Sequence, residues 1–217
     1  EGGTILYTAT VTAPVTGSAV VVTLANGQTI TIPVGQSSGT ATAAVSNDVY
    51  QGHAAVTNSI TSVSGGNYES LVADKTEVST SVTDEQDSTA GCLSATQTVA
   101  EGGQIVYTAT LTNAAQTAVT VTLSNGQTIS IAANQTSGSV AVATHGDNPY
   151  LDAGQVSARI TGASGGNFEN LAVNSTPAVT NVTDTVDTST VSLTATPSVA
   201  EGGTILYTAT VTAPVTG

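Results

Sequence analysis

The chain repeats itself with a period of one hundred residues. Residues 1–17 and 201–217 share one sequence, EGGTILYTATVTAPVTG, and residues 101–110 begin a further copy with EGGQIVYTAT. This period suits a small β-sandwich of about 100 residues, whereas solenoid repeats span roughly 20–50 residues. The repeat therefore predicts a tandem array of similar domains, whose function would follow from the array and not from one site.

The composition is that of β-strands, because Val, Ile, Leu, Ala and Thr dominate and β-branched side chains suit a pleated, half-buried sheet. The sequence has no amphipathic helical window and no apolar run of the about 18 residues that span a membrane. Short alternating strands are expected at residues 5–12, 19–24, 28–34, 39–45, 54–63 and 68–83, the last with a break near residues 74–75. Asn26-Gly27 is a hairpin signal, since both residue types accept positive φ. We predict an all-β fold of tandem immunoglobulin-like antiparallel β-sandwich domains in an elongated array.

The first strand of each domain precedes its EGG turn. LSATQTVA at Leu93–Ala100 and LTATPSVA at Leu193–Ala200 both alternate as a first strand should. The polar stretches TDEQDST and TDTVDTST then mark the boundaries. The predicted domains are residues 1–87, a sandwich lacking its first strand, 88–187, a complete sandwich, and 188–217, the first two strands of a third repeat.

The two repeats align closely, with a slip of one residue placed at the hairpin and recovered by Tyr50 and Tyr150. The positions predicted to form the cores are Ile5, Tyr7, Leu24, Ile30 and Leu71, with their partners Ile105, Tyr107, Leu123, Ile129 and Leu171.

Two explanations remain open for why residues 1–87 lack a first strand and residues 188–217 hold only two strands. In the first, the sequence is cut from a longer tandem array without regard to domain boundaries; the start at Glu1 and the lack of methionine indicate a fragment or a processed product. In the second, Leu193–Ala200 fills the vacant first-strand site of residues 1–87 in the next molecule, as in donor-strand polymers. Unprotected sheet edges seek partners, which makes the second explanation feasible.

The chain is strongly acidic, with a formal charge of −13 and only Lys75 and Arg159 positive. Nucleic-acid binding is excluded because it needs clusters of Lys or Arg, and anionic lipid surfaces are disfavoured for the same reason. The excess of acidic over basic residues is compatible with high solubility, with a saline extracellular environment or with binding of divalent cations. A solvated acidic surface alone accounts for most of this excess.

The acids recur around the linkers. If seven strands alternate in direction, the EGG turn, the SNDVYQG loop and the exit of the domain lie at the same end. The acids gathered at the first junction are then Glu1, Asp48, Asp84 and Asp87, and those at the second are Glu101, Asp147, Asp184 and Asp187. Glu169, beside SGGN, would face the first linker from the next domain.

Close carboxylates repel one another unless a cation neutralises them, and Ca²⁺ accepts about six to eight oxygen ligands in flexible geometry. We therefore predict a Ca²⁺ ion at each junction, with metal ligands drawn from Glu1, Asp48, Asp84, Asp87, Glu101, Glu169, Asp184 and Asp187. The alternative is a polar, solvated linker.

The sequence carries no catalytic signature: it has no Ser–His–Asp order, no paired-cysteine metal motif and no phosphate loop. His53 and His145 fall at different places in the repeats and are expected to be structural or surface residues. Cys92 is the only cysteine, and its counterpart in the next repeat is Ser192, so no shared chemistry depends on it. A glycan-binding module is weakly supported, because such sites display aromatic residues and the chain has no Trp and one Phe.

The segments VSLTATPSVAEGGTILYTATVT, NGQTI, SGGNFENL and VTDTVDTST together resemble the bacterial immunoglobulin-like extender repeats of giant type I-secreted RTX adhesins, which anchor bacteria in biofilms or to other surfaces. The resemblance covers the whole chain and implies tandem sandwiches stiffened by calcium at their junctions. The matching positions are Asp84, Asp87, Asp184, Asp187 and the glutamates of EGG and of SGGN-aromatic-Glu. Because TAGCLSATQ in one linker differs from TSTVSLTATP in the other, it stays open whether the junctions bind equally.

We expect a non-enzymatic, extracellular spacer on a bacterial cell surface, without membrane insertion, which projects a distal binding domain. Its partners would be the neighbouring repeats of the same chain. The alternative is a subunit of an extracellular fibre that self-assembles when residues 193–200 enter the vacant first-strand site of residues 1–87.

Overall fold

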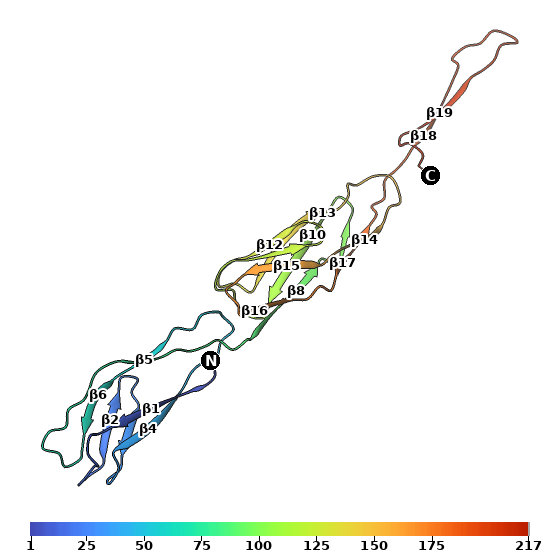
Figure 1. Cartoon of the computed structure of the whole chain (residues 1–217). Coiled ribbons are helices and arrows are strands. Elements are labelled where there is room, and N and C mark those ends of the chain that lie inside the picture. Colours follow the sequence, from blue (N-terminus) through green and yellow to red (C-terminus); the bar gives the residue numbers. More distant parts are fainter. Residues whose placement is uncertain (217) are drawn as a thin grey trace. The chain divides into compact units, whose positions relative to one another are not determined.

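The computed structural model describes residues 1–216, and all helices and strands assigned among these residues are β-strands, with no helix. The chain forms two compact units (Figure 1). Unit 1 consists of Glu1–Thr89 with Asn167–Leu171, and unit 2 consists of Ala90–Gly166 with Ala172–Gly217. The predicted fold class, all-β with immunoglobulin-like antiparallel sandwiches, is confirmed. No helix among the described residues is long and apolar enough to cross a membrane.

Unit 1 is built from short strands that bury every second side chain. Its strands are β1 (Thr4–Thr10), β2 (Val20–Leu24), β3 (Thr29–Ile32), β4 (Ser38–Ala44), β5 (Val56–Asn58), β6 (Ile60–Ser64) and β7 (Val78–Thr80). They pair as β1–β4, β3–β2–β6 and β5–β7. In β1 the alternation points Ile5, Tyr7 and Ala9 into the core and the threonines outward, as the sequence pattern requires.

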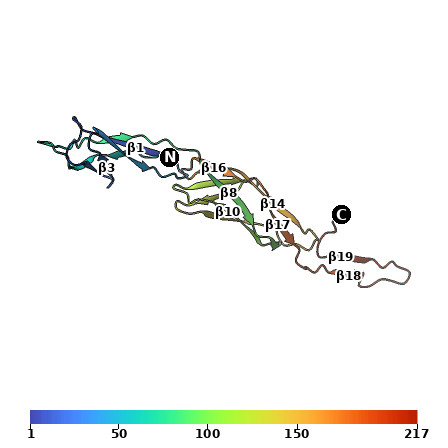
Figure 2. The same cartoon turned by 90° about the horizontal axis from the view of Figure 1, so that it is seen from below.

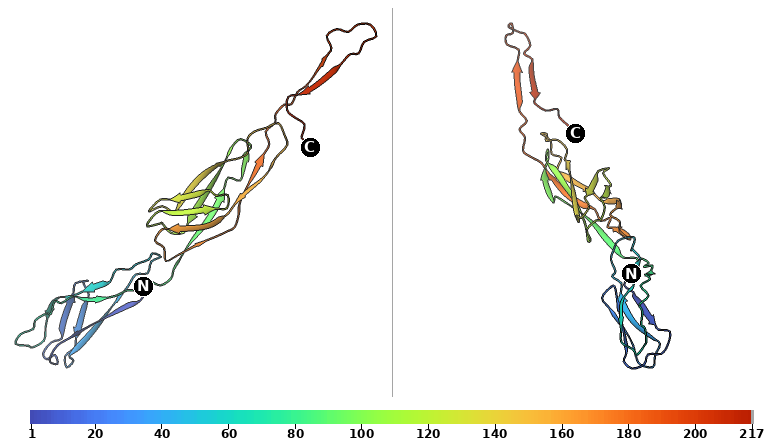
Figure 3. Two further views of the ribbon diagram at one scale, coloured as in Figure 1. Left: turned by 45° about the horizontal axis from the view of Figure 1, so that its top comes forward. Right: turned by 90° about the vertical axis from the view of Figure 1, so that its left-hand side faces the viewer.

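The second repeat has counterparts of all these strands and adds a first strand and the short strand β16 (Figure 2). Its strands are β8 (Ser88–Ala95), β9 (Thr98–Ala100), β10 (Gln104–Leu111), β11 (Val119–Leu123), β12 (Thr128–Ile131), β13 (Ser137–Ala143), β14 (Gly154–Ala158), β15 (Ile160–Gly165), β16 (Asn170–Val173) and β17 (Ala178–Thr183). The sheets are ordered β13–β10–β8–β16, β12–β11–β15 and β14–β17–β9. Two further strands, β18 (Val191–Ala195) and β19 (Tyr207–Val211), form an antiparallel hairpin, drawn in the reddest part of the ribbon in Figure 3.

Two predicted strands are each two strands in the structure. The first strand at Leu93–Ala100 is divided between β8, which pairs antiparallel with β10, and β9, which pairs parallel with β17. A similar division separates β5, which pairs with β7, from β6, which pairs with β2. A strand that changes partner can contribute to two sheets of a sandwich, which a single alternating pattern does not reveal. The predicted strand at residues 68–83 contains only β7 in the first repeat, and its counterpart in the second repeat has the expected break, between β16 and β17.

The predicted hairpin is present in both repeats, but only its glycine has positive φ. Gly27 has a φ of 83° and Gly126 a φ of 81°, whereas neither preceding asparagine has positive φ. The amide of Gly27 donates to the Leu24 carbonyl oxygen at 3.0 Å, and the Leu24 amide donates to the Gln28 carbonyl oxygen at 2.8 Å. This is a type I turn closed by a left-handed glycine, the three-residue form of hairpin connection.

The one-residue slip between the repeats begins before the predicted place. Strand β10 starts one hundred residues after β1, but β11 starts ninety-nine residues after β2. The deletion therefore lies in the turn between those strands, and the placement at the hairpin was wrong. The register recovers just after β13, where His145-Gly146-Asp147 occupies the place of Ser46-Asn47. Surface turns accommodate such changes without disturbing the paired strands.

The buried hydrophobic side chains are mostly aliphatic, and Tyr7, Tyr107 and Phe168 are the aromatic ones among the described residues. Ile5, Tyr7, Leu24 and Ile30 are buried in unit 1, as are Ile105, Tyr107, Leu123 and Ile129 in unit 2. These eight predictions are confirmed. Leu71 and Leu171 are only half-buried: Leu71 lies outside any strand, and Leu171 lies in the short strand β16 at the end of its sheet. Burial also raises the pKa of Tyr107, whose phenolic oxygen makes no hydrogen bond within the described residues.

Candidate functional site

Three carboxylates meet in unit 1. Glu1 precedes β1, Asp84 follows β7, and Glu169 precedes β16 within the segment Asn167–Leu171 that belongs to this unit. One ligand atom from each lies within 4.8 Å of the other two. Glu1 and Glu169 are half-buried and Asp84 is exposed. All three were predicted from the sequence, and we call this group the first acidic cluster.

The glutamate of the second repeat is held in unit 1 by the residues before it. Tyr50 and Phe168 form an isolated antiparallel bridge, and their rings stack with centroids 5.6 Å apart. The Gln51 amide donates to the Asn167 carbonyl oxygen at 2.9 Å, and the Glu169 amide donates to the Val49 carbonyl oxygen at 3.0 Å. These backbone bonds fix the position of the Glu169 carboxylate.

The glutamates of the first acidic cluster each have one oxygen without a partner. Glu169 Oε2 accepts a hydrogen bond from the Asp87 amide at 2.6 Å, and Glu1 Oε2 accepts a long one from the Asp48 amide at 3.4 Å. The Oε1 atoms of both glutamates are buried and make no hydrogen bond within the described residues. Buried carboxylate oxygens without partners are costly, so this arrangement suits a bound cation.

Asp84 connects the cluster to the loop after β4. Its Oδ2 accepts from the Gly52 amide at 2.8 Å and its Oδ1 from the His53 amide at 3.2 Å. Carboxylate oxygens with backbone donors keep lone pairs for a cation, because each oxygen can accept more than one interaction. The linker at Asp84 is thereby tied to the same loop that holds the second-repeat segment.

The other two acids predicted for this junction lie outside the cluster. Asp48 Oδ1 accepts from the Tyr50 amide at 2.8 Å, which closes a local Asx turn. Asp87 Oδ2 accepts from Asn47 Nδ2 at 2.6 Å, and Asp87 reaches the cluster only through its backbone amide. Both therefore shape the loop around the cluster.

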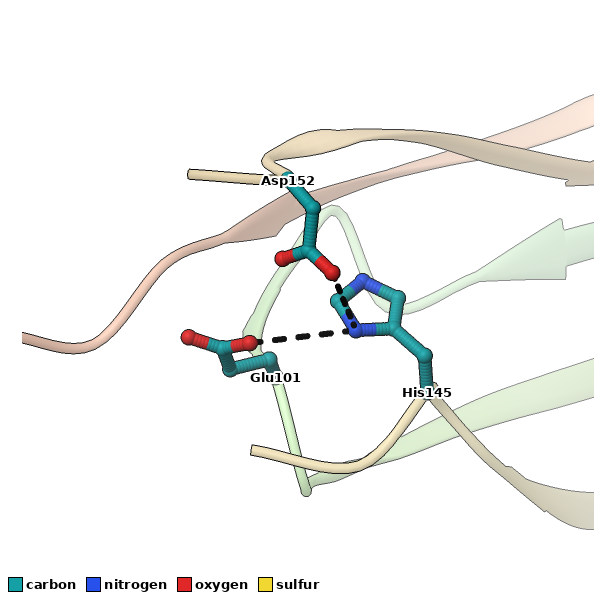
Figure 4. A group of neighbouring side chains, drawn as sticks. All are labelled: Glu101, His145 and Asp152. Carbon is teal, nitrogen blue, oxygen red and sulfur yellow. Dashed lines mark ion pairs between the residues drawn. The ribbon is translucent and has the colours of Figure 1, made fainter. Parts of the chain in front are cut away.

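A second group, in unit 2, contains a histidine (Figure 4). Glu101 follows β9, His145 follows β13 and Asp152 precedes β14, and one ligand atom from each lies within 4.8 Å of the others. His145 Nδ1 is 3.8 Å from Glu101 Oε2 and 3.6 Å from Asp152 Oδ2. In Figure 4 both carboxylates face the same ring nitrogen. We call this group the histidine cluster.

Glu101 is the buried member of the histidine cluster. Its Oε1 accepts from the Thr185 amide at 2.8 Å and from the Thr185 hydroxyl at 3.2 Å. Its Oε2 is buried and has no hydrogen-bond partner within the described residues. Asp147 lies nearby, and its Oδ1 shares the single hydrogen of the Thr185 hydroxyl with Glu101 Oε1.

Asp152 was missed in the sequence analysis. The side-chain amide of Asn148 donates to Asp152 Oδ2 at 3.0 Å, and this bond is the main cause that lowers the pKa of the Asp152 carboxyl. Burial opposes the shift, and nearby His145 adds to it. The signal in the sequence was the replacement of Gly52 in the first repeat by an acid in the second. His145 was expected to be structural or on the surface; it is 38% exposed, and its ring faces two carboxylates.

The remaining predicted ligands of the second junction, Asp184 and Asp187, are members of neither group. Asp184 Oδ1 accepts from the Asp152 amide at 3.1 Å, just as Asp84 accepts from Gly52 in the first repeat. Asp187 is exposed and belongs to neither three-residue group of residues 1–216.

The comparison with protein families agrees with the repeat structure. The family model described as "LapA domain" matches residues 1–85 and again residues 87–185, which is most of the chain. A comparison with curated proteins gave no match. The family is that of large, LapA-like adhesins, which are in general non-enzymatic and act at the cell surface or outside the cell. The chain belongs to the LapA domain family and contains two successive copies of that domain.

Proposed function

We propose that the chain is an extender segment of a bacterial cell-surface adhesin, stiffened by Ca²⁺ at the linker that begins at Asp84. The segment projects a distal binding domain away from the cell. The immunoglobulin-like extender repeats of RTX adhesins are the type that fits this role. The proposal is structural and needs no catalytic group.

The observation that carries the proposal is the pair of buried, unpartnered oxygens in the first acidic cluster. Glu1 and Asp84 belong to the first repeat and Glu169 to the second, so one cation would join residues of both. Two like charges about 4–5 Å apart repel by roughly 3–4 kcal/mol at an effective dielectric constant of about 20. A cation would replace this repulsion with attraction and satisfy both Oε1 atoms at once.

The ligand chemistry favours Ca²⁺. The first acidic cluster offers only oxygen, and Ca²⁺ takes about six to eight oxygen ligands with tolerant geometry, whereas Mg²⁺ demands a near-ideal octahedron. Asp84 is exposed, so water can complete the ligand set. Glu1, Asp84 and Glu169 would hold the ion, and the bound ion would restrain the linker that begins at Asp84.

Small-angle scattering of the full chain tests the mechanical role. With saturating Ca²⁺ we expect a larger maximum dimension and less evidence of flexibility than in EDTA, because the restrained linker samples fewer conformations. The linker variant Asp84→Asn should scatter with Ca²⁺ as the wild type does in EDTA. Superimposable wild-type profiles with and without Ca²⁺ would contradict the extender mechanism.

Strand donation is the second candidate, favoured by a groove along β1. In unit 2, β10 pairs with both β13 and β8, but β1 pairs only with β4 among the described residues. A groove beside β1 is lined by Ile5, Tyr7 and Asn58, and the buried Asn58 Nδ2 has no hydrogen-bond partner there. The hairpin strand β18 exposes Val191 and Leu193 by 70% and 67%. Residues 193–200 of another copy have the composition to fill the groove.

A peptide of residues 190–200 distinguishes strand donation from a spacer. If the groove accepts this strand, the labelled peptide should bind the full chain and raise its melting temperature, because it pairs with β1 and buries apolar side chains. A peptide of the same composition in scrambled order is the control. Strand donation is excluded if light scattering shows a monomer at high concentration and the peptide does not bind the chain.

A further inference from the structure

We propose that the histidine cluster, formed by Glu101, His145 and Asp152, binds a divalent transition-metal ion, with Zn²⁺ preferred. The site lies in unit 2 and is independent of the calcium proposal, which concerns unit 1. Its three ligand atoms are Glu101 Oε2, His145 Nδ1 and Asp152 Oδ2.

The spacing of the ligand atoms fits a shared ion better than direct contact. The distances of 3.8 Å and 3.6 Å from His145 Nδ1 to the two carboxylate oxygens are too long for hydrogen bonds. Two ligands at about 2.1 Å from a tetrahedral Zn²⁺ ion lie about 3.4 Å apart. Small movements of the exposed His145 and Asp152 side chains would therefore bring all three atoms into the coordination shell.

Glu101 provides an independent sign of a ligand. Its side chain is fully buried, and Oε2, the oxygen that faces His145, makes no hydrogen bond within the described residues. Thr185 holds the other oxygen through its amide and its shared hydroxyl hydrogen and so fixes the direction in which Oε2 points. A buried anionic oxygen aimed at an imidazole nitrogen and a second carboxylate is an arrangement that a cation completes.

The imidazole ligand of His145 determines which class of metal ion the site favours. Ca²⁺ takes oxygen ligands, whereas a set of one imidazole and two carboxylates is typical of Zn²⁺ and its neighbours in the first transition series. Asn148 donates to Asp152 Oδ2, and the Asp152 amide donates to Asp184. These bonds form the outer shell that orients metal-binding carboxylates.

The first repeat lacks this site, and the reason is visible in the sequence. His145 lies in the three residues that replace Ser46-Asn47 after β4, and Asp152 stands where the first repeat has Gly52. Only the glutamate is shared, as Glu1. The two changes convert one end of an otherwise similar sandwich from a set of oxygen ligands into a mixed nitrogen and oxygen set.

Visible absorption of Co²⁺, a spectroscopic substitute for Zn²⁺, tests the proposal on the full chain in buffer with and without Ca²⁺. We expect the bands of a low-symmetry Co²⁺ site, their loss on addition of Zn²⁺, and the same result whether or not Ca²⁺ is present. His145→Gln and Asp152→Gly, which restores the residue of the first repeat, should each weaken Zn²⁺ binding at least tenfold. Both residues are exposed, so these variants are expected to fold.

His53→Gln is the matched control, because His53 is the other histidine of the chain and belongs to neither three-residue group. It should bind Co²⁺ and Zn²⁺ as the wild type does. The proposal is overturned if the wild type binds no Zn²⁺, if His145→Gln binds it equally well, or if His53→Gln loses it. A failure of Ca²⁺ to bind unit 1 would change none of these readouts.

Discussion

Glu169→Gln is expected to weaken Ca²⁺ binding at the first acidic cluster about a hundredfold. The change keeps the size of the side chain but removes one of three negative charges and places an amide at a position where one oxygen is buried without a partner. The affinity of Ca²⁺ sites depends strongly on the number of charged ligands. A hundredfold loss corresponds to about 2.8 kcal/mol of binding free energy. Isothermal titration calorimetry of the full chain measures the affinity directly.

Glu69→Gln is the control for this experiment. Glu69 occupies the same place in SGGNYE as Glu169 does in SGGNFE, but it is exposed and belongs to neither cluster. This variant should retain the wild-type affinity and the wild-type stabilisation by Ca²⁺, which follows from binding to the folded state alone. Equal loss of affinity in both variants would mean that general surface charge, and not the cluster, attracts the ion.

Gly165→Ala is expected to destabilise unit 2 by roughly 3 kcal/mol or more, since left-handed backbone strain and steric overlap add to each other. Gly165 has a φ of 97° and ends β15 opposite Val119. A Cβ atom at this position would overlap the carbonyl oxygen of Ala118. Urea unfolding followed by circular dichroism should show an earlier transition for unit 2.

Gly126→Ala separates the two causes. Gly126 has a similar φ of 81°, but a Cβ atom there would meet nothing within 4 Å. Its loss of stability should be about 1 kcal/mol, the cost of a left-handed conformation for a residue with a side chain. Similar losses in the two variants would show that steric overlap at Gly165 is relieved by movement of the backbone.

The strands could be predicted because each is a short alternating run bounded by polar turns. The alternation of Ile5, Tyr7 and Ala9 with threonines specifies both a strand and its inner face. The change of partner between β8 and β9 could not be predicted, since Leu93–Ala100 alternates in one unbroken pattern. β8 pairs with the neighbouring strand β10, whereas the sheet that β9 joins is decided by its pairing with β17, which is distant in the sequence.

The first acidic cluster could be predicted from the sequence, because the alternating strand directions place Glu1 and Asp84 at one end of the sandwich, beside the segment that contains Glu169. Asp48 and Asp87 lie at the same end, but their carboxylates accept hydrogen bonds from the Tyr50 amide and from Asn47 Nδ2, and only side-chain geometry reveals this difference. The histidine cluster was missed because a one-residue insertion brings His145 into place. When the two repeats are aligned and the loop after β13 is set aside as a variable surface connection, the new histidine in that loop is overlooked.

If Ca²⁺ restrains one repeat relative to the next, the distance between labels on the two repeats is less variable when the ion is bound, and the width of its distribution measures this restraint. Spin labels on the exposed Cys92 in unit 2 and on an introduced cysteine, Thr31→Cys, in unit 1 allow a double electron–electron resonance measurement on the full chain. We predict a narrow distribution with Ca²⁺, a broad one in EDTA, and a broad one in Glu169→Gln at a Ca²⁺ concentration that saturates only the wild type. Equal widths in the wild type with and without Ca²⁺ would show that the ion does not restrain the linker.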